Sequence, residues 1–218
     1  MKLIRKAALY IKECRKNDCD IFLVILRYVY YKSIYNKKII AHQKVKIEGI
    51  NNIITKANLH IGDFYIGFSM KNDPTLLNIR GKMIINGPYS IGRGCRFDIA
   101  ENATLIIGNG GFINANSIIS ISSGLKIGND CSISWGCQFI DSDFHIINYE
   151  RKIERSNEIL IGNHVWIGCN ACLLKGTVIP DNCVIAANSV VSGIFKEKSV
   201  LIGGNPAKII RRDITWKA

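Results

Sequence analysis

A six-residue period runs through the chain from residue 85 to residue 191 and limits the possible folds more than any other feature. Each repeat has one bulky apolar residue, often followed by glycine, and in many repeats a small residue four positions later. An α-helix has a period of 3.6 and a plain strand a period of 2, so neither explains the pattern. The fifteen apolar residues of this column are Ile85, Ile91, Phe97, Ile107, Ile113, Ile119, Ile127, Ile133, Phe139, Ile161, Ile167, Leu173, Ile179, Ile185 and Val191.

A short strand followed by a turn, repeated three times per coil, does explain the pattern. The apolar residues then point inward and stack on their equivalents one coil away, about 4.8 Å apart as in parallel strands. Each buried isoleucine contributes roughly 1.5 to 3 kcal/mol, and no coil can bury its face alone. Residues 45–80 repeat less regularly, and we interpret them as imperfect first coils. The period therefore predicts an all-β solenoid. Its small-residue column consists of Cys95, Ser117, Cys131, Cys137, Ala171, Thr177, Cys183 and Ser189.

Three breaks in the period indicate residues inserted at corners of the solenoid. The next apolar position comes ten residues after Phe97, eight after Ile119 and twenty-two after Phe139. The longest break contains His145 and a polar run that cannot bury a core. We therefore expect a protruding loop around 146–158.

The positive charge of the chain is concentrated at its N-terminus. Of the net charge of +12, residues 1–46 contribute 12 Lys or Arg against 3 acidic residues. Residues 1–38 alternate apolar and basic positions, which predicts one or two amphipathic helices that either pack on the main domain or dock on a membrane surface. No nucleic-acid-binding motif is present, so nucleic acid is not an expected partner. We divide the chain into a basic helical N-terminal segment (1–45), a β-helix domain (46–205) and a basic C-terminal tail (206–218).

The eight cysteines are better explained by packing than by disulfides or zinc. Four of them occupy the small-residue column, where a free thiol behaves as a small apolar group. Cys169 and Cys172 have a C-x-x-C spacing, but no second pair accompanies them, so no metal is expected. The first apolar block, at 21–26, is too short for a membrane span and lacks a signal cleavage site. We therefore expect a cytoplasmic protein with reduced thiols.

Three segments near the C-terminus resemble a known enzyme family. They are I-G-N-H-V-W-I-G at 161–168, I-P-D-N-C-V-I-A-A-N-S-V-V at 179–191 and G-G-N-P-A-K-I-I-R at 203–211. Together with the six-residue period, they resemble the closing coils of the hexapeptide-repeat acyltransferases, of the galactoside, maltose and polysaccharide O-acetyltransferase type. The resemblance implies a left-handed parallel β-helix, acetyl-CoA as co-substrate, and a homotrimer with active sites between neighbouring subunits.

The resemblance also places the general base at His145, at the corner before the long insertion. Free imidazole, with a pKa of about 6.5, can take the proton of a sugar hydroxyl at neutral pH. Asp141 and Asp143 alternate with His145 and would face the same side of an extended segment. Three interpretations stay open for them: solvated turn residues, one aspartate (Asp143) orienting the imidazole, or a metal site. The small number of histidines counts against the metal site. Asp141 is also a candidate for contact with the acceptor.

Other candidate residues follow from the same resemblance. Asn114 and Asn116 lie in a position like that of the acceptor-binding asparagine of galactoside-type members, although a turn would also favour asparagine there. Trp166 and Gly168 match the segment near coenzyme A, and we expect the tryptophan to point away from the core. No Cys or Ser beside His145 suggests a covalent intermediate, so we expect direct attack on the thioester.

The contacts to coenzyme A depart from the family pattern at one position. Ala187 and Ser192 match residues along the pantetheine arm, but Gly193 stands where members commonly have a Lys or Arg. Another cation must therefore reach a phosphate. The candidates are Lys208 and Arg211, together with Lys196 and Arg212.

Together these features predict an O-acetyltransferase that moves acetyl from acetyl-CoA to a hydroxyl of a cell-surface polysaccharide or its lipid-linked precursor. We expect it in the cytoplasm, at the inner face of the membrane if residues 1–38 dock there. Two enzymes of the same fold are alternatives: an antibiotic acetyltransferase and a sugar-nucleotide N-acyltransferase. A non-catalytic binding or scaffold protein is the alternative of another class, and it would show no acetyl-CoA turnover.

Overall fold

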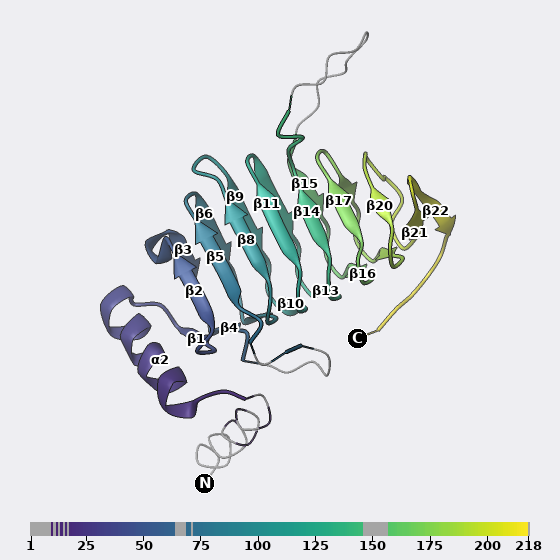
Figure 1. The fold of residues 1–218 in the computed structure, drawn as a ribbon. Helices are drawn as coiled ribbons and strands as arrows, with labels where there is room; N and C mark the ends of the chain where they lie inside the picture. Colours follow the sequence, from purple (N-terminus) through teal and green to yellow (C-terminus); the bar gives the residue numbers. More distant parts are fainter. Residues whose placement is uncertain are drawn as a thin grey trace.

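The computed structural model describes residues 10, 12, 14, 16, 18–63, 69–70, 72–145 and 157–217. The chain winds into a prism of stacked coils, with the N-terminal helix at one end and the last strands at the other (Figure 1). This prism is a left-handed parallel β-helix, which confirms the predicted fold class. Most of the loop predicted around 146–158 lies outside the described residues, as do residues 1–9 of the predicted N-terminal helices.

Each coil contributes strands to three sheets, which we name face 1, face 2 and face 3 in the order in which the chain visits them. Face 1 consists of β1 (Ile39–Ala41), β4 (Leu59–Ile61), β7 (Tyr89–Ile91), β10 (Gly111–Ile113), β13 (Cys131–Ile133), β16 (Trp166–Ile167), β19 (Val184–Ile185), β21 (Leu201–Gly204) and β22 (Ala207–Arg211). Face 2 consists of β2 (Val45–Glu48), β5 (Thr75–Ile79), β8 (Arg96–Ile99), β11 (Ile118–Ile121), β14 (Gln138–Ile140), β17 (Cys172–Leu174) and β20 (Val190–Val191). Face 3 consists of β3 (Ile53–Thr55), β6 (Lys82–Ile85), β9 (Thr104–Ile107), β12 (Gly124–Ile127), β15 (Ile159–Ile161) and β18 (Val178–Ile179).

The strands of successive coils pair in parallel, and the last pair, β21 with β22, is antiparallel. Residues 207–211 of the predicted tail therefore belong to face 1. The 3-10 helix η1 (Ile50–Asn52) connects face 2 to face 3 in the first coil.

The column of fifteen apolar residues forms the core of the prism. Every one of them is at most 3% exposed. Equivalent residues stack coil on coil as predicted: on face 1, Ile91, Ile113, Ile133, Ile167 and Ile185 are successive partners in register. Because each strand is short, the fold depends on this stacking between coils.

The cysteines of the small-residue column are packing residues, as expected. Cys95, Cys131, Cys137 and Cys183 are buried, and the Cys95 thiol donates to the carbonyl oxygen of Asn114 at 3.2 Å. Burial raises the pKa of Cys95 and Cys137 to about 12 and that of Cys131 to about 11. These thiols stay protonated near neutral pH and are poor nucleophiles.

The first coils carry the same register as the later ones. Strands β1 to β5 pair in parallel with the strands of the following coils. The irregular spacing of residues 45–80 comes from a segment inserted between β4 and β5, at 62–74, rather than from imperfect coils. The first strand begins at Ile39, before the domain boundary placed at residue 46.

The helix α2 (Ile21–Tyr35) lies against β1 at the N-terminal end of the prism (Figure 1). Asp20 caps its first turn by accepting a backbone hydrogen bond at 3.1 Å, and Asn36 ends it in the left-handed conformation. Its buried side chains are Val24 and Tyr31. Within the described part of the chain, no helix is long and apolar enough to cross a membrane.

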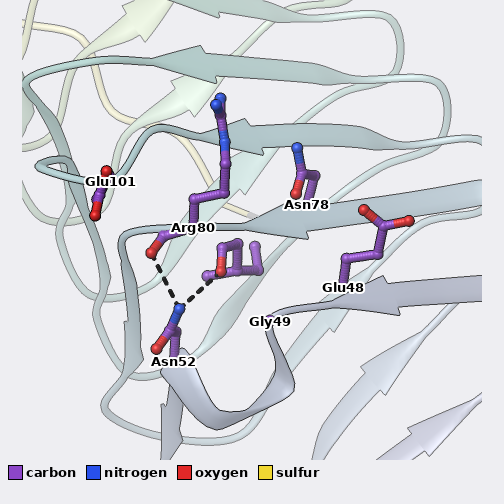
Figure 2. Close-up of a pocket in the computed structure, with 7 residues that line it drawn as sticks. Glu48, Gly49, Asn52, Asn78, Arg80 and Glu101 are labelled. Atoms are coloured by element: carbon purple, nitrogen blue, oxygen red, sulfur yellow. Dashed lines mark hydrogen bonds between the residues drawn. The ribbon is translucent and has the colours of Figure 1, made fainter.

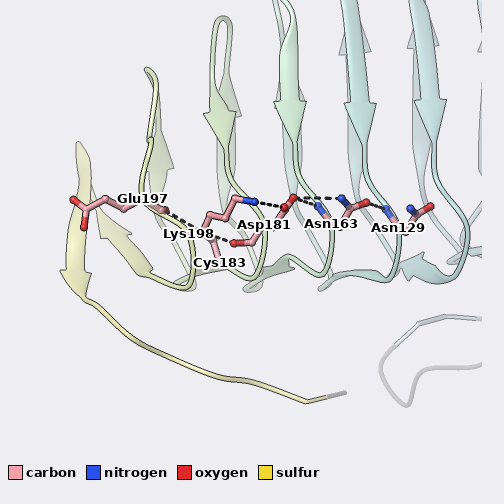
Figure 3. A network of polar contacts seen from close by, with 6 residues as sticks. All are labelled: Asn129, Asn163, Asp181, Cys183, Glu197 and Lys198. Atoms are coloured by element: carbon pink, nitrogen blue, oxygen red, sulfur yellow. Dashed lines mark hydrogen bonds and ion pairs between the residues drawn. The ribbon is translucent and has the colours of Figure 1, made fainter.

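Corner 3–1, between face 3 and face 1, is held by a ladder of polar side chains (Figure 3). Asn163 Oδ1 accepts from the backbone N–H of Asn129 at 2.9 Å, and Asp181 Oδ1 accepts from that of Asn163 at 2.8 Å. Lys198 Nζ ends the ladder by donating to Asp181 Oδ2 at 2.8 Å. The Lys198 ammonium and the Asn163 N–H lower the pKa of the Asp181 carboxyl. The ladder fixes the register of successive coils at this corner.

Candidate active site

Corner 2–3, between face 2 and face 3, is where the longest insertion leaves the coil. Strand β14 ends at Ile140 and β15 begins at Ile159. His145 lies in the first residues of the insertion, and its side chain is exposed. Phe144 before it has a φ of 57°, so the backbone turns sharply there. The imidazole is therefore carried on the outside of the prism and is accessible to a substrate.

Asp141 has a structural role at this corner. It is completely buried, and its carboxylate accepts hydrogen bonds from the backbone N–H groups of Ser122, Ser123 and Gly124 at 2.6, 2.7 and 2.7 Å. These contacts hold the preceding coil against the start of the insertion. The expectation that Asp141 contacts the acceptor is corrected here, because its oxygens are buried and engaged by these three backbone N–H groups.

Asp143 forms an ion pair with Lys175, which lies at the same corner one coil further on. Both side chains are partly exposed, at 38% and 40%. The expectation that Asp141, Asp143 and His145 share one side is wrong, because no strand continues past Ile140 and Asp141 points inward. The pair ties the insertion to the neighbouring coil near His145.

Trp166 points outward from face 1, as expected. Its side chain is 42% exposed, and its Nε1 donates to Ser134 Oγ at 3.2 Å. Trp216, from the C-terminal segment, lies beside it with ring centroids 6.1 Å apart. The Trp216 ring also stacks on His164, with centroids 4.0 Å apart and planes within 6°. The result is an aromatic surface on face 1 that includes a residue far away in the sequence.

His145 and Trp166 lie on opposite sides of one chain. In a three-sided prism, face 1 lies across from corner 2–3. Trp166 projects from face 1, and His145 follows the last strand before corner 2–3 in its coil. The hydrophobic core separates the two groups, so they do not meet within a single chain.

Gly168 and Ala187 stack at corner 1–2, between face 1 and face 2. The backbone N–H of Gly168 donates to the carbonyl oxygen of Ile185 at 2.8 Å. A Cβ on Gly168 would lie only 2.6 Å from the backbone nitrogen of Ala187, so glycine permits the close approach of the two coils. Ala187 is exposed, which leaves its backbone open along this corner.

The two candidate asparagines lie at the same corner, in an earlier coil. Asn116 adopts a φ of 59°, and its backbone N–H donates to the carbonyl oxygen of Arg93 at 3.0 Å. The Oδ1 atom of Asn114 accepts from the N–H of Ala115 at 2.9 Å. Both asparagines thus contribute to the turn itself. Only the half-buried Asn114 is on the side of the turn next to face 1.

The candidate cations lie near the C-terminal end of the prism. Lys208 and Arg211 are exposed on β22, and Ser192 is exposed at corner 2–3. Arg212 is instead paired with Glu197 through two hydrogen bonds, at 2.7 and 3.1 Å, and its guanidinium lowers the pKa of Glu197. Among the described ion pairs none involves Lys208, Arg211 or the equally exposed Lys196, so these three cations are better candidates for a phosphate than Arg212.

Three residues near these groups were not anticipated: Trp135, Lys175 and Trp216. Trp135 is 42% exposed at corner 1–2, between the coils of Asn114 and Gly168. A tryptophan in the turn position of a repeat was a usable signal for it. Lys175 and Trp216 had no such signal, because their roles depend on which coils lie next to each other.

A shallow depression at corner 2–3 of the first coils lies away from these residues (Figure 2). Asn52 Nδ2 donates across it to the carbonyl oxygens of Ile79 and Arg80, at 2.9 and 3.1 Å. The Arg80 and Asn78 side chains are both bound to Asp98 at 2.9 Å. Its polar groups are therefore largely engaged with one another. His145 lies at the same corner, but three coils further along face 2.

Comparison with known proteins identifies the family. A model described as "Bacterial transferase hexapeptide (six repeats)" matches residues 158–193. The "Uncharacterized 24.8 kDa protein in cps region" of Klebsiella pneumoniae is 36% identical over 218 residues, covering 99% of this chain and 98% of its own. The chain belongs to the bacterial hexapeptide transferase family. It is an acyltransferase, as predicted.

Other members of the hexapeptide transferase family show similarity over parts of the chain. The polysialic acid O-acetyltransferase of Neisseria meningitidis is 36% identical over 130 residues, covering 58% of this chain and 57% of its own. The putative lipopolysaccharide biosynthesis O-acetyl transferase WbbJ of Escherichia coli is 26% identical over 160 residues, covering 68% and 81%. The crystal structure of the polysialic-acid-specific acetyltransferase NeuO matches with a TM-score of 0.54 at 23% identity, covering 80% and 72%, and supports the fold.

Proposed function

We propose that this hexapeptide transferase moves acetyl from acetyl-CoA to a sugar hydroxyl of a cell-surface polysaccharide or its lipid-linked precursor. The observation that carries the proposal is the exposed His145 at the inserted corner of a hexapeptide-repeat β-helix. The relatives named above as O-acetyltransferases of polysialic acid and lipopolysaccharide support a glycan acceptor. On this proposal the enzyme works in the cytoplasm, at the inner face of the membrane where lipid-linked acceptors are available.

His145 is proposed as the general base. One ring nitrogen accepts the proton of the sugar hydroxyl while the oxygen attacks the thioester carbonyl carbon. As the tetrahedral intermediate collapses, the C–S bond breaks and the imidazolium returns its proton to the leaving thiolate. The buried cysteines of the core stay protonated and inward, which supports direct transfer rather than an acyl-enzyme. The ion pair of Asp143 with Lys175 restrains the segment that carries the base.

Most residues proposed for coenzyme A lie on face 1 or at corner 1–2 beside it, and Ser192 lies apart from them at corner 2–3. Trp166 offers an exposed ring, and Gly168 and Ala187 offer backbone groups where two coils approach closely. Lys208 and Arg211 are exposed cations without a described ion pair, and a phosphate needs such charges. Ser192 lies at corner 2–3 and Asn114 at corner 1–2; we propose the first for the pantetheine arm and the second for the acceptor.

A homotrimer is proposed because one chain holds the two halves of this site apart. His145 leaves corner 2–3, whereas Trp166 projects from face 1 on the other side of the core. Three parallel prisms around a common axis can place the corner of each chain against face 1 of its neighbour. The base of one chain then faces the coenzyme A residues of the next.

The test is release of coenzyme A from acetyl-CoA, measured over a panel of sugars, lipid-linked glycans, sugar nucleotides and aminoglycoside or streptogramin antibiotics. We expect turnover with a glycan, and a loss of about 10² to 10⁴-fold in His145→Ala with the fold intact. The matched control is His60→Gln, which removes a histidine of β4 in the first coils, away from the coils that carry the proposed site. It should retain activity within about threefold, because it touches none of the residues proposed for the reaction.

The same panel distinguishes the rival functions. Turnover only with an antibiotic or only with an amino sugar nucleotide would overturn the proposed acceptor but keep the transferase. No turnover with any compound, together with no binding of acetyl-CoA, would favour a non-catalytic β-helix. Full activity in His145→Ala would reject the proposed base.

A further inference from the structure

Helix α2 exposes a broad apolar face. Phe22 is 74% exposed and Ile34 is 65% exposed, although both belong to a helix whose buried contacts are made by Val24 and Tyr31. The large apolar side chains of α2 that are exposed are Phe22, Leu23, Ile25, Leu26, Val29, Tyr30 and Ile34. Most soluble proteins scatter such residues singly, so seven of them on fifteen residues mark a contact surface.

These exposed residues share one side of the helix. With a rotation of about 100° per residue, Phe22, Leu26 and Val29 fall on nearly the same line, opposite Val24 and Tyr31. The packed side and the exposed side are therefore both apolar. A helix that also exposes apolar side chains on the side away from the prism needs a second apolar environment for them.

The charge around the helix identifies the kind of environment. Between residues 21 and 47 the sequence holds six Lys or Arg and no Asp or Glu. Lys32, Lys38 and Lys44 are exposed there. Two copies of the chain joined through this surface would bring like charges together. An anionic lipid headgroup layer offers the complementary charge, and its acyl boundary accepts the apolar side chains.

We propose that α2 is a peripheral docking surface for an anionic phospholipid bilayer, in which the helix lies along the interface. A helix of fifteen residues is too short to span the hydrocarbon layer, so its exposed side chains enter only the outer part of the leaflet. The α2 surface lies at the N-terminal end of the prism, away from the insertion that carries His145 (Figure 1). Docking therefore leaves the proposed catalytic corner free.

The test uses the full chain and sedimentation with vesicles. One set contains roughly three parts phosphatidylcholine to one part phosphatidylglycerol, and the other contains phosphatidylcholine alone. We expect the wild type to bind the anionic vesicles at least about tenfold more strongly, and to lose much of that binding when salt rises from about 0.1 M to 0.5 M. The variant Phe22→Gln with Leu26→Gln and Val29→Gln should bind at least about tenfold more weakly.

Two controls make the result specific. Met70→Gln removes an apolar side chain with 73% exposure outside α2 and should bind as the wild type does. The triple variant should keep its solution mass and its acetyl transfer to a soluble acceptor within about twofold, so a failure of docking is distinguishable from a failure of the proposed transferase. Absence of wild-type binding, or undiminished binding by the triple variant, would overturn the proposal. A solution mass of the triple variant below that of the wild type would also overturn the proposal, because it would assign α2 to contacts between copies of the chain.

Discussion

Corner 3–1 and corner 2–3 of the same prism use their polar side chains for different purposes. At corner 3–1, Asn129, Asn163, Asp181 and Lys198 bind one another from coil to coil, so each polar side chain has a partner in the chain itself (Figure 3). At corner 2–3, the insertion after β14 carries His145 outward into solvent. A polar residue of this fold has a structural role where a group of the next coil binds it. It is available for chemistry where an insertion carries it away from the stacked coils.

Asp141 refines this comparison, because it belongs to corner 2–3 and behaves like a ladder residue. It lies four positions before His145 and is fully buried, with three backbone N–H groups bound to it. The border between the structural part and the proposed catalytic part of corner 2–3 thus falls between Asp141 and His145. Four predictions test this comparison of the two corners.

The largest expected effect tests whether His145 at corner 2–3 acts only together with Trp166 of a neighbouring chain. His145→Ala and Trp166→Ala should each be inactive alone, but mixed trimers of the two contain some sites with both groups intact. Random mixing should restore about a quarter of wild-type coenzyme A release, because half the chains supply each group. Activity that stays at background after verified subunit exchange would mean that both groups act from one chain.

Asp141→Ala is expected to cost about 3 kcal/mol of unfolding free energy, since a buried acceptor of three hydrogen bonds is removed. Asp143→Ala is the matched control on the same segment. It should cost under about 1 kcal/mol, because its ion pair with Lys175 is partly exposed. Urea unfolding followed by circular dichroism measures both. Equal losses of unfolding free energy in the two variants would contradict the different roles assigned to Asp141 and Asp143.

Asn163→Ala at corner 3–1 should cost about 1 kcal/mol, because it removes the acceptor of the Asn129 N–H from an exposed ladder. Acetyl transfer should remain within about twofold of the wild type. The same unfolding and turnover assays apply. A large loss of turnover with little loss of stability would show that the ladder takes part in the site.

The smallest effect concerns the acid dependence of corner 3–1. The pKa of Asp181 is lowered by Lys198 and Asn163, so its carboxylate stabilises the fold above the unfolded pKa of about 3.9 and this contribution is lost as the pH falls through the folded pKa. Asp181→Asn should therefore be less stable than the wild type near neutral pH, with the two curves converging in acid. Parallel stability curves from neutral pH down to acid would contradict this assignment.

Much of the solenoid could be predicted because its period is local. The column from Ile85 to Val191 needed only spacing and apolar character, and every member is buried. The first coils were harder, because the segment at 62–74 shifts the phase between β4 and β5. Trp166 could be predicted to point outward, since the residue after it belongs to the inward column. The exposed apolar side of α2 could not be separated from its packed side, because both are apolar.

The sequence by itself determined the fold class, the position of the main insertion and the family, because a fixed spacing of apolar residues dictates stacking wherever the chain turns. Only the tertiary structure decided the partners of the polar groups. It buried Asp141 against three backbone amides, paired Asp143 with Lys175 and brought Trp216 beside Trp166. Those contacts join residues in different coils or beyond the last coil, and their spacing along the chain depends on the lengths of the intervening segments, which no local pattern specifies.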